Sequence, residues 1–243
     1  MAEKKARFKA KIDLKDLLDA GCHFGHQAQR WNPLMDSYLY GVRDGVHIFD
    51  LAKTKANLEK ALDFVYETTL NGGQIIFVGT KRQAQAIIKE EAQRANMPFI
   101  SERWMGGLVT NWDHVKKSIK KLKDLKEKKK TGELSSQYTK RENVLIDREI
   151  ARLERFFGGL VGLNRLPVSI FVVDVKKENA AVREAGNKNI AIVGIVDSNS
   201  NPTPIDWPIP ANDDAVGSIK LIVSLVAEAA KQGQEVYNKK NVK

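Results

Sequence analysis

The sequence predicts an α/β fold in which a doubly wound parallel sheet is interrupted by an inserted pair of helices. Short apolar runs alternate with helix-like stretches, as in parallel strands joined by helical crossovers. That alternation stops over residues 108–160, where apolar residues recur at steps of three and four. The net charge of +10 is concentrated in two short segments, which points to a polyanionic partner.

The chain begins with a basic segment followed by small structural elements. We expect residues 1–12 to form an N-terminal tail, which carries five Lys or Arg and one Glu. Asp13 predicts the cap of a short helix over residues 14–20. Farther along, the two glycines within residues 38–48 predict a small hairpin.

The first half of the sheet domain has the order helix, strand, helix. Asp50 precedes an amphipathic pattern that ends at residues 71–73, which predicts a helix. Residues 75–78 are a continuous apolar run, typical of a strand that is buried on both faces. A tight turn and a helical pattern to Asn96 follow, and together they form the start of a βα unit.

The same alternation returns in the second half of the chain. The pattern predicts a strand, a helix, a second strand, a short edge strand and a final helix, over residues 168–173, 174–187, 190–196, 207–209 and about 213–233 in that order. We therefore expect a discontinuous sheet domain over residues 13–107 and 161–233, with helices on both faces. Residues 234–243 are expected to form a basic C-terminal tail.

Residues 108–160 predict an antiparallel helical hairpin, because two apolar seams of the same rhythm imply two helices that face each other. Thr139 and Glu142 have the spacing of a capping box that would start the second helix. The seams consist of Leu108, Trp112, Val115, Ile119 and Leu122 in the first helix and of Ile146, Ile150, Leu153, Phe157 and Leu160 in the second.

The first helix of this hairpin carries the second basic segment. Residues 113–130 contain nine Lys against three acidic residues. Such concentrated charge is typical of a surface that contacts nucleic-acid phosphates, and a solvated charged face is the alternative. The cluster expected on the outer face of the helix consists of Lys116, Lys117, Lys120, Lys121 and Lys123.

Lys81 and Arg82 are a second candidate phosphate contact. They lie where a predicted strand ends and a helix begins, which is where a doubly wound fold binds anions. The Gly-rich spacing of a P-loop or of a dinucleotide fingerprint is missing, so a nucleotide site is not expected. An ordinary helix start with exposed basic residues is the alternative.

Two arginines stand next to tryptophans, Arg30 beside Trp31 and Arg103 beside Trp104. This pairing suits a phosphate contact combined with stacking on an unpaired base. The alternative is that both tryptophans are core or hinge residues that anchor the hairpin.

Cys22, His23 and His26 offer three potential metal ligands within five residues. No second ligand pair follows at zinc-finger spacing. The aspartates that could add a ligand for zinc or magnesium are Asp197, Asp213 and Asp214. The interpretation we favour is a structural turn in which the imidazoles are hydrogen-bonded.

No enzyme family is indicated by the motifs. The sequence contains no Gly-x-Ser-x-Gly elbow, His-Glu-x-x-His pair, Walker motif or kinase signature, so we expect no catalytic residues. The rival interpretation is a nucleotide- or metal-dependent enzyme whose polar lining is Thr80, Lys81, Asp197 and Asp213. The single cysteine and the lack of a long apolar run favour a reducing cytoplasm and no membrane span.

Seven short motifs resemble those of one known family, the universal second protein of the small ribosomal subunit in its bacterial form. They occur in the order of that family over nearly the whole chain. The motifs are AGCHFGH at 20–26, RWNP at 30–33, GVHI at 45–48 with DL at 50–51, FVGTK at 77–81, RWMGG at 103–107 with TN at 110–111, VDSN at 196–199 and IPANDDA at 209–215. Cys22 departs from the valine that is more usual there, which keeps a metal at His23 or His26 open.

The resemblance implies a flavodoxin-like, doubly wound, five-stranded parallel sheet with an inserted antiparallel coiled-coil helical hairpin. It implies a structural, ribosome-bound role with small-subunit rRNA and neighbouring ribosomal proteins as partners, among them the large first protein. It implies neither a small-molecule substrate nor a membrane partner. With the patterns above, the expected RNA-contacting residues are Arg30, Trp31, Lys81, Arg82, Arg103, Trp104, Asn111, Lys116, Lys117, Lys120, Lys121 and Lys123.

Overall fold

Five parallel strands form the central sheet of the computed structural model, in the order β5-β4-β6-β7-β8. The strands are β4 Ile75–Val78, β5 Phe99–Ile100, β6 Ser169–Val173, β7 Ala191–Val196 and β8 Trp207–Pro210. Strands β4 and β6 are buried at every position, as the continuous apolar runs predict. The predicted five-stranded parallel sheet is therefore confirmed, although the sequence pattern located only four of its strands.

The structure describes Phe8 and residues 12–241. The rest of the predicted N-terminal tail, residues 1–7 and 9–11, lies outside the described residues, as do residues 242–243. The backbone N–H of Phe8 donates to Asp63 Oδ1 at 2.9 Å. This bond places Phe8 against helix α2, which spans Leu51–Leu70.

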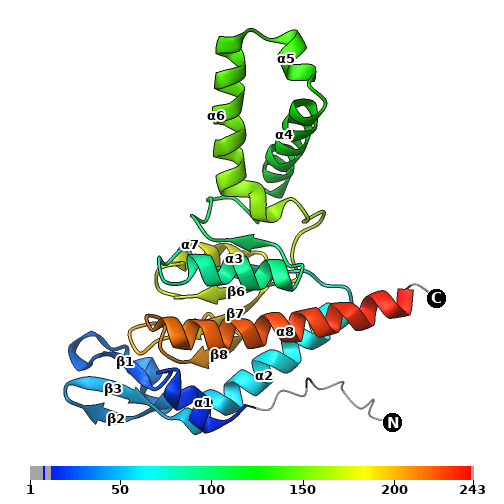
Figure 1. The fold of residues 1–243 in the computed structure, drawn as a ribbon. Coiled ribbons are helices and arrows are strands. Elements are labelled where there is room, and N and C mark those ends of the chain that lie inside the picture. The colour runs from blue at the N-terminus through cyan, green and yellow to red at the C-terminus, as the bar shows by residue number, and fades with distance from the viewer. Residues whose placement is uncertain (1–7, 9–11, 242–243) are drawn as a thin grey trace.

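The helices cover both faces of the sheet, so the domain has three layers (Figure 1). Alternate strand side chains point to opposite faces: Phe77 packs with α2, α3 and α8, whereas Ile76 packs with α7. The helices of these layers are α2 Leu51–Leu70, α3 Gln85–Arg94, α7 Asn179–Asn187 and α8 Val216–Asn241. The doubly wound arrangement follows from strands that are apolar on both faces.

A second, three-stranded antiparallel sheet lies beside the domain, in the order β1-β3-β2. Its strands are β1 Phe24–Gln27, β2 Leu39–Arg43 and β3 Val46–Phe49, and the short helix α1 Leu14–Asp19 precedes them. The predicted hairpin corresponds to β2 and β3, whereas β1 was not predicted. The segment between β1 and β2 holds two 3-10 helices, Ala28–Arg30 and Pro33–Tyr38.

Helix caps agree with the sequence signals. The Asp13 carboxylate accepts the backbone N–H of Lys15 at the start of α1. The Asp50 carboxylate accepts the N–H groups of Ala52 and Lys53 at the start of α2. Each carboxylate satisfies donors that the first helical turn leaves without a backbone partner.

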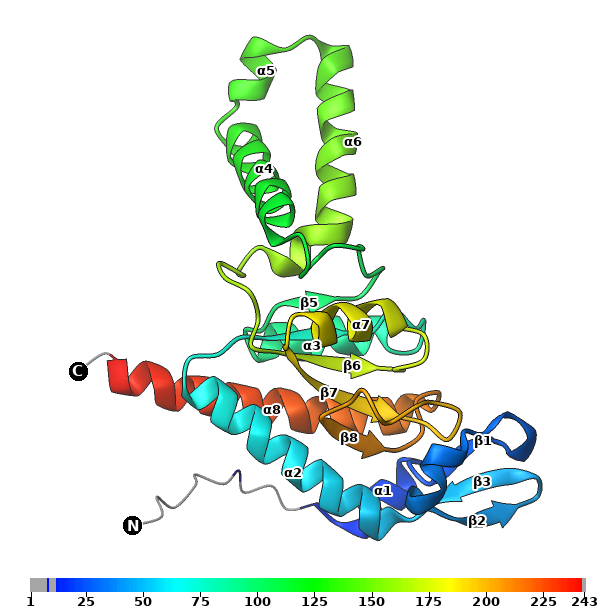
Figure 2. The ribbon, with the colours of Figure 1, turned by 180° about the vertical axis from the view of Figure 1, so that it is seen from behind.

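Helices α4 Trp112–Lys130, α5 Glu133–Gln137 and α6 Lys140–Phe157 project away from the sheet as an arm (Figures 1 and 2). We use the name "arm" for these three helices and their connections. Helix α4 leads away from the sheet and α6 leads back to it. The capping box is present at the start of α6, where Thr139 and Glu142 bond to each other's backbone.

The apolar contact between α4 and α6 lies at the base of the arm. Val115, Ile119 and Leu122 of α4 and Leu153 and Phe157 of α6 are buried. Nearer the tip, the predicted seam residues Ile146 and Ile150 are only half-buried. Ion pairs also link the two helices along their length, and they are Lys121–Glu149 at 2.8 Å, Lys129–Asp147 at 2.6 Å and Lys126–Glu154.

The prediction for the last helix is wrong at both ends. Helix α8 begins at Val216 rather than near Asp213, because the Asn212 side chain accepts the N–H groups of Asp214 and Ala215 in a turn. It continues to Asn241, so residues 234–241 extend the helix and do not form a separate tail. Gly233, read as the helix end, lies inside the helix.

Gly233 is required by a close approach between α8 and α2. A Cβ atom there would lie 2.6 Å from the carbonyl oxygen of Tyr66 and would also collide with Thr69. Only glycine lets the two backbones come this close.

In the described part of the chain, no helix is long and apolar enough to cross a membrane.

Replacing Gly233 with alanine is expected to destabilise the protein by about 1–3 kcal/mol, because the added methyl group overpacks the α2–α8 contact. Chemical unfolding of the full chain measures the change. The control is Gly186→Ala in α7, where a Cβ would meet nothing within 4 Å. The control should stabilise by about 0.5 kcal/mol through helix propensity, and equal effects at both positions would contradict the close-packing explanation.

Candidate nucleic-acid interface

Four arm lysines line one hollow at the base of α4. The rest of the lining is one carboxylate, two apolar residues and an amide. The concavity measures about 580 Å³ and is bordered by Lys116, Lys117, Lys120 and Lys123 together with Asp113, Ile119, Leu163 and Asn164. All four lysines are exposed. Among the described residues, none of these four ammonium groups has an ion pair. Helical spacing explains the grouping, because residues 116, 120 and 123 fall on one face of α4.

Lys121 does not line this lysine hollow, but it borders a neighbouring hollow of about 350 Å³ together with Lys117 and Lys120, so the predicted lysines lie beside one another on α4. The Lys121 ammonium is 2.8 Å from Glu149 of α6. Glu149 accepts hydrogen bonds from Arg152 and Lys121. These bonds lower the pKa of Glu149 to about 2, and the bond from Arg152 has the larger effect. Lys121 therefore contributes to the link between the arm helices while its side chain stays exposed, and the other four lysines line the hollow at the base of α4.

Trp104 is buried, so the expectation that it stacks on an RNA base is wrong for this arrangement. The side chain is 6% exposed and belongs to the core that joins the arm to the sheet. Its indole N–H donates to Glu184 Oε1 of α7 at 3.1 Å. The alternative reading, a residue that anchors the hairpin, fits this position. The neighbouring Arg103 is exposed.

Trp31 is half-buried and lies against His47, with ring centroids 5.0 Å apart. Arg30 beside it is exposed at the end of a 3-10 helix. Asn111 and Arg82 are also exposed. Arg30 and Trp31 belong to the segment between β1 and β2, and Arg82 belongs to the turn before α3. Asn111 is the N-cap residue of α4, but it does not line the lysine hollow.

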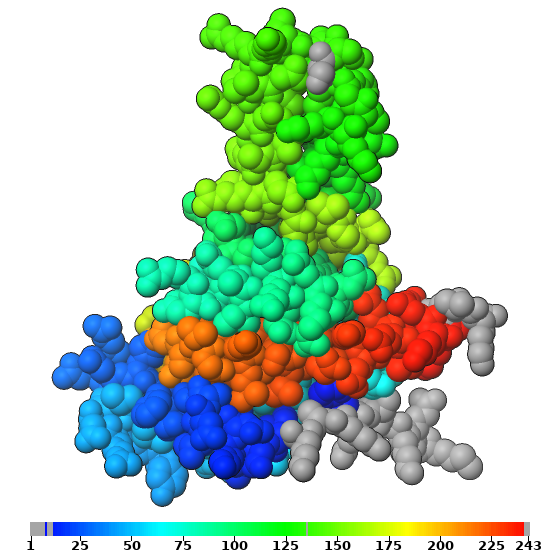
Figure 3. Space-filling view, viewed as in Figure 1, coloured from blue at the N-terminus to red at the C-terminus, as the bar shows by residue number. Residues whose placement is uncertain are grey.

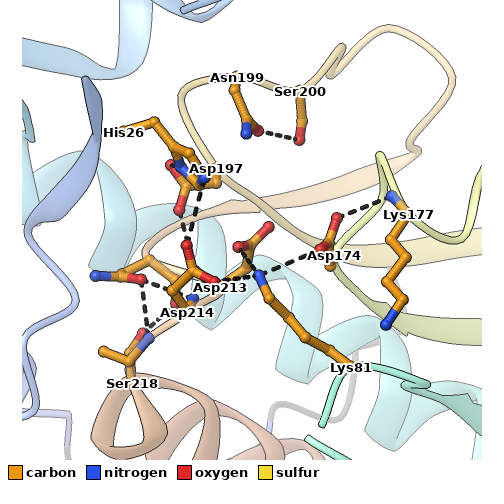
Figure 4. Close-up of polar contacts among 12 residues, drawn as sticks. His26, Lys81, Asp174, Lys177, Asp197, Asn199, Ser200, Asp213, Asp214 and Ser218 are labelled. Carbon is orange, nitrogen blue, oxygen red and sulfur yellow. Dashed lines mark hydrogen bonds and ion pairs between the residues drawn. The ribbon is translucent and has the colours of Figure 1, made fainter. Parts of the chain in front are cut away.

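Lys81 is held by carboxylates, as Figure 4 shows. Its Nζ lies 2.7 Å from Asp213, 2.6 Å from Asp214 and 3.2 Å from Asp174. The ammonium is thus already neutralised. Lys81 therefore has its partners within the protein, contrary to the expectation of a phosphate contact, whereas Arg82 is exposed and forms no ion pair with a described residue.

The metal-ligand candidates separate into two groups. His26 Nδ1 lies 2.9 Å from Asp197 Oδ1, and its Nε2 lies 3.4 Å from Asp214 Oδ2. His26, Asp213 and Asp214 present ligand atoms that all lie within 4.8 Å of one another, which is a geometry that can hold a cation. Together with Asp197, they lie at the carboxyl ends of the strands.

Cys22 and His23 do not join this group. Cys22 is fully buried in the core near Ser218, and burial raises its pKa. The His23 ring contacts the Phe24 ring in a tilted arrangement with centroids 4.0 Å apart, and burial lowers the pKa of His23. A thiolate zinc site at residues 22–26 is therefore not formed in this arrangement.

The carboxylates shift the pKa values of the groups between them. The hydrogen bond to Asp197 raises the pKa of His26. Burial raises the pKa of Asp213 to about 7, and the negative charges of Asp197 and Asp174 add to the effect. Burial alone would lower the pKa of Lys81, but Asp213 and its neighbours overcome that and raise it. His26, Lys81 and Asp213 therefore bind their protons more tightly in the folded protein than in the unfolded chain.

Two partners in these networks were missed by sequence reasoning. Asp174 ends strand β6, and the carboxyl ends of parallel strands meet at one edge, so its approach to Lys81 could have been inferred. The contact of Glu184 with the base of the arm could not be predicted. The spacing of residues in α7 does not identify which of its side chains reaches the segment before α4.

Asp213→Asn should flatten the dependence of stability on pH. The folded pKa of about 7 exceeds the ordinary 3.8, so the folded chain retains a proton that the unfolded chain releases. Stability from this group is present at low pH and falls as pH rises from about 4 to about 7. Thermal unfolding in chelating buffer at about pH 5 and about pH 8 should show a smaller drop for the variant than for the wild type.

The control for this measurement is Asp44→Asn in the exposed β2–β3 turn. Asp44 has a φ of 52°, a conformation that asparagine also tolerates. Its pH profile should match that of the wild type. An unchanged profile for Asp213→Asn would contradict the assignment of the retained proton to Asp213.

Comparison with known proteins agrees with the motif order. The family described as Ribosomal protein S2 matches residues 17–233. A protein of Chloroflexus aggregans named small ribosomal subunit protein uS2 is 47% identical over 222 residues, covering 91% of this chain and 93% of the relative. A protein of the same name from Bifidobacterium longum subsp. infantis is 46% identical over 224 residues, covering 92% of this chain and 80% of the relative.

The matched region includes the whole central sheet and the arm, and only the two ends of the chain fall outside it. The identity extends over nearly the full length of the chain rather than over one motif. The chain therefore belongs to the S2 family of small-subunit ribosomal proteins.

Proposed function

We propose that this protein is a structural constituent of the small ribosomal subunit, bound to the ribosome in the cytoplasm, where it contacts rRNA and supports translation. The observation that carries the rRNA contact is the lysine hollow. Four exposed ammonium groups line one concavity on α4, and none of them is ion-paired with a carboxylate of the described residues, although Asp113 lies at the same concavity. Unpaired cations grouped on one face attract phosphates, because each contact releases counterions from the nucleic acid.

The arm supports this role as an antiparallel coiled-coil hairpin inserted into a flavodoxin-like domain. Its base shares one core with the sheet, through Leu122 and Leu153 in the arm and Ile170 in β6. This continuity holds the lysine hollow at a defined place on the molecule. Figure 3 shows the arm rising well clear of the body.

Three exposed arginines are secondary candidates for phosphate contact. They are Arg30, Arg82 and Arg103. A guanidinium group suits phosphate because it donates in a planar fork. Trp31 could extend the contact at Arg30 by stacking, whereas Trp104 and Lys81 have partners within the protein.

A different surface is the candidate contact for neighbouring ribosomal proteins, including the large first protein. Phe24, Tyr40 and Val42 are exposed on the small sheet, beside a hollow of about 820 Å³. Exposed apolar patches of this kind commonly mark protein–protein contacts. Its location away from α4 would allow RNA and protein to bind at the same time.

An enzyme that uses the carboxyl edge of the sheet is the rival function. The polar groups of that edge already satisfy one another, since Lys81 pairs with Asp213, and the Thr80 hydroxyl donates to Glu178 at 2.5 Å. We therefore propose a structural role for this edge. Equilibrium dialysis of the full chain against nucleoside triphosphates should show no stoichiometric binding, and saturable binding would favour the enzyme.

Changing Lys116, Lys117, Lys120 and Lys123 together to Glu should strongly weaken binding to a small-subunit rRNA transcript. If each lysine meets one phosphate, the slope of log affinity against log salt should also fall by roughly three. Filter binding at several salt concentrations measures both quantities. Incorporation into small subunits, followed by sucrose-gradient sedimentation, should decrease in parallel.

The matched control changes four exposed lysines outside the arm to Glu, and these are Lys60, Lys89, Lys188 and Lys220. Both variants change the net charge equally, so a difference between them reports position rather than total charge. Equal losses in the two variants would show that only net charge matters and would contradict the proposed interface.

A further inference from the structure

The arm joins the sheet domain through two segments of chain that are fastened in different ways. The outgoing segment runs from β5 to the start of α4 and contains turns rather than strand or helix. The returning segment passes from α6 through a 3-10 helix, Gly158–Leu160, toward β6. The direction of the arm depends on how firmly both segments are held.

The returning segment is fastened by packing and by one ion pair. A Cβ on Gly159 would lie 2.9 Å from Cδ2 of the Phe99 ring in β5, so the two segments are in tight contact. Arg155 of α6 donates from Nε to Glu102 of the outgoing segment at 3.0 Å on the exposed surface, so this pair links the two segments. Exposed pairs of this kind contribute little to stability, so packing dominates here.

The outgoing segment packs into the core through Leu108 and Val109, and several of its hydrogen-bond donors converge on one carboxylate, that of Glu184 in α7. Glu184 Oε1 accepts the indole N–H of Trp104 at 3.1 Å and the backbone N–H of Gly107 at 2.8 Å. Its Oε2 accepts the Thr110 hydroxyl at 3.2 Å and the Val109 N–H at 3.4 Å. Four donors within seven consecutive residues thus converge on one side chain.

This carboxylate takes the place of regular backbone pairing in the outgoing segment. Without it, the N–H groups of Gly107 and Val109 would lose the partner that the structure provides, and such losses are costly where water is excluded. Burial alone would raise the pKa of Glu184, but the four donated bonds outweigh burial and lower it. The ionised carboxylate is therefore the form that holds the segment.

Small rotations at the base become large displacements on the arm. Helix α4 has 19 residues, so its tip lies about 28 Å from its base at 1.5 Å per residue. A rotation of roughly 10° would move the tip by about 5 Å and the lysine hollow by about 1–3 Å. The smaller shift is already enough to break a charged hydrogen bond to a fixed phosphate.

We propose that Glu184 is a positioning residue that fixes the direction of the arm relative to the sheet without itself contacting RNA. The consequence for RNA affinity rests on the proposed function, because it assumes that the lysine hollow meets phosphates. The directional role does not depend on that assumption. It can be measured on the free protein.

The test measures the distance between a spin label at the arm tip and one on the sheet domain, in the full-length chain. Lys130→Cys and Lys89→Cys provide exposed labelling sites, and the buried Cys22 is replaced by valine. Double electron–electron resonance should give one narrow distance for the parent protein. Glu184→Ala should broaden or shift that distribution, and Glu184→Gln, which keeps one acceptor oxygen, should give an intermediate result.

The control is Glu90→Gln on the exposed face of α3, which should leave the distance unchanged. An unchanged narrow distance in folded Glu184→Ala would overturn the proposal. Loss of the circular dichroism signal in both Glu184 variants would also overturn it, because the residue would then serve general stability. Retained helix content with a broadened distance supports a positioning role.

RNA binding separates this proposal from the proposed function. If the productive direction is populated about one fifth of the time in Glu184→Ala, affinity for an rRNA transcript should fall about fivefold. The four-lysine variant should lose affinity while keeping the narrow distance. If the four-lysine variant binds normally, the proposed interface fails, and the distance measurement still decides the role of Glu184.

Discussion

The parallel pairing of β4 with β6 is the contact on which the arrangement of this molecule depends. Ile75 pairs with Ser169 and Val78 with Val172, although the whole arm lies between these strands in the sequence. The pairing brings the two ends of the insertion to the same region of the sheet and places β5 at the edge beside them. The arm can then leave and return over a short base whose core is continuous with that of the sheet.

Charge is distributed over this frame in two different ways. At the carboxyl edge of the sheet, acidic side chains surround Lys81 and His26, so the cations there are held inside the protein. On α4, the lysines that line the hollow have no such partners within the described chain. The same residue type therefore has a structural role in one place and forms an open cationic surface in the other.

Local signals explain how much of the fold could be predicted from the sequence. Some signals act over only a few residues, and these predict their helices and strands correctly. Examples are the helix caps at Asp50 and Thr139 and the continuous apolar run of the strand at residues 75–78. Strands β1 and β5 were missed because they are short and depend on pairing with distant segments. Gly233 misled the prediction, because its role comes from contact with α2 and not from a helix end.

The sequence predicted the cationic character of the candidate site, but not which of its side chains bind to other residues of the protein. The lysines of α4 were expected on an outer face, and four of them lie around one hollow. The sequence could not reveal that Lys121 faces Glu149 or that Trp104 meets Glu184, since both contacts join residues far apart in the chain. Basic and aromatic residues look alike in sequence whether they meet RNA or the protein itself.

The central claim is that the lysine-lined face of α4 meets rRNA in the assembled small subunit. Site-specific photocrosslinking tests it most directly, with a photoreactive side chain placed at position 120 in one protein and at position 60 in another. Crosslinks to rRNA from position 120, but not from position 60, are the predicted result. Crosslinks from position 120 to ribosomal proteins alone would contradict the claim.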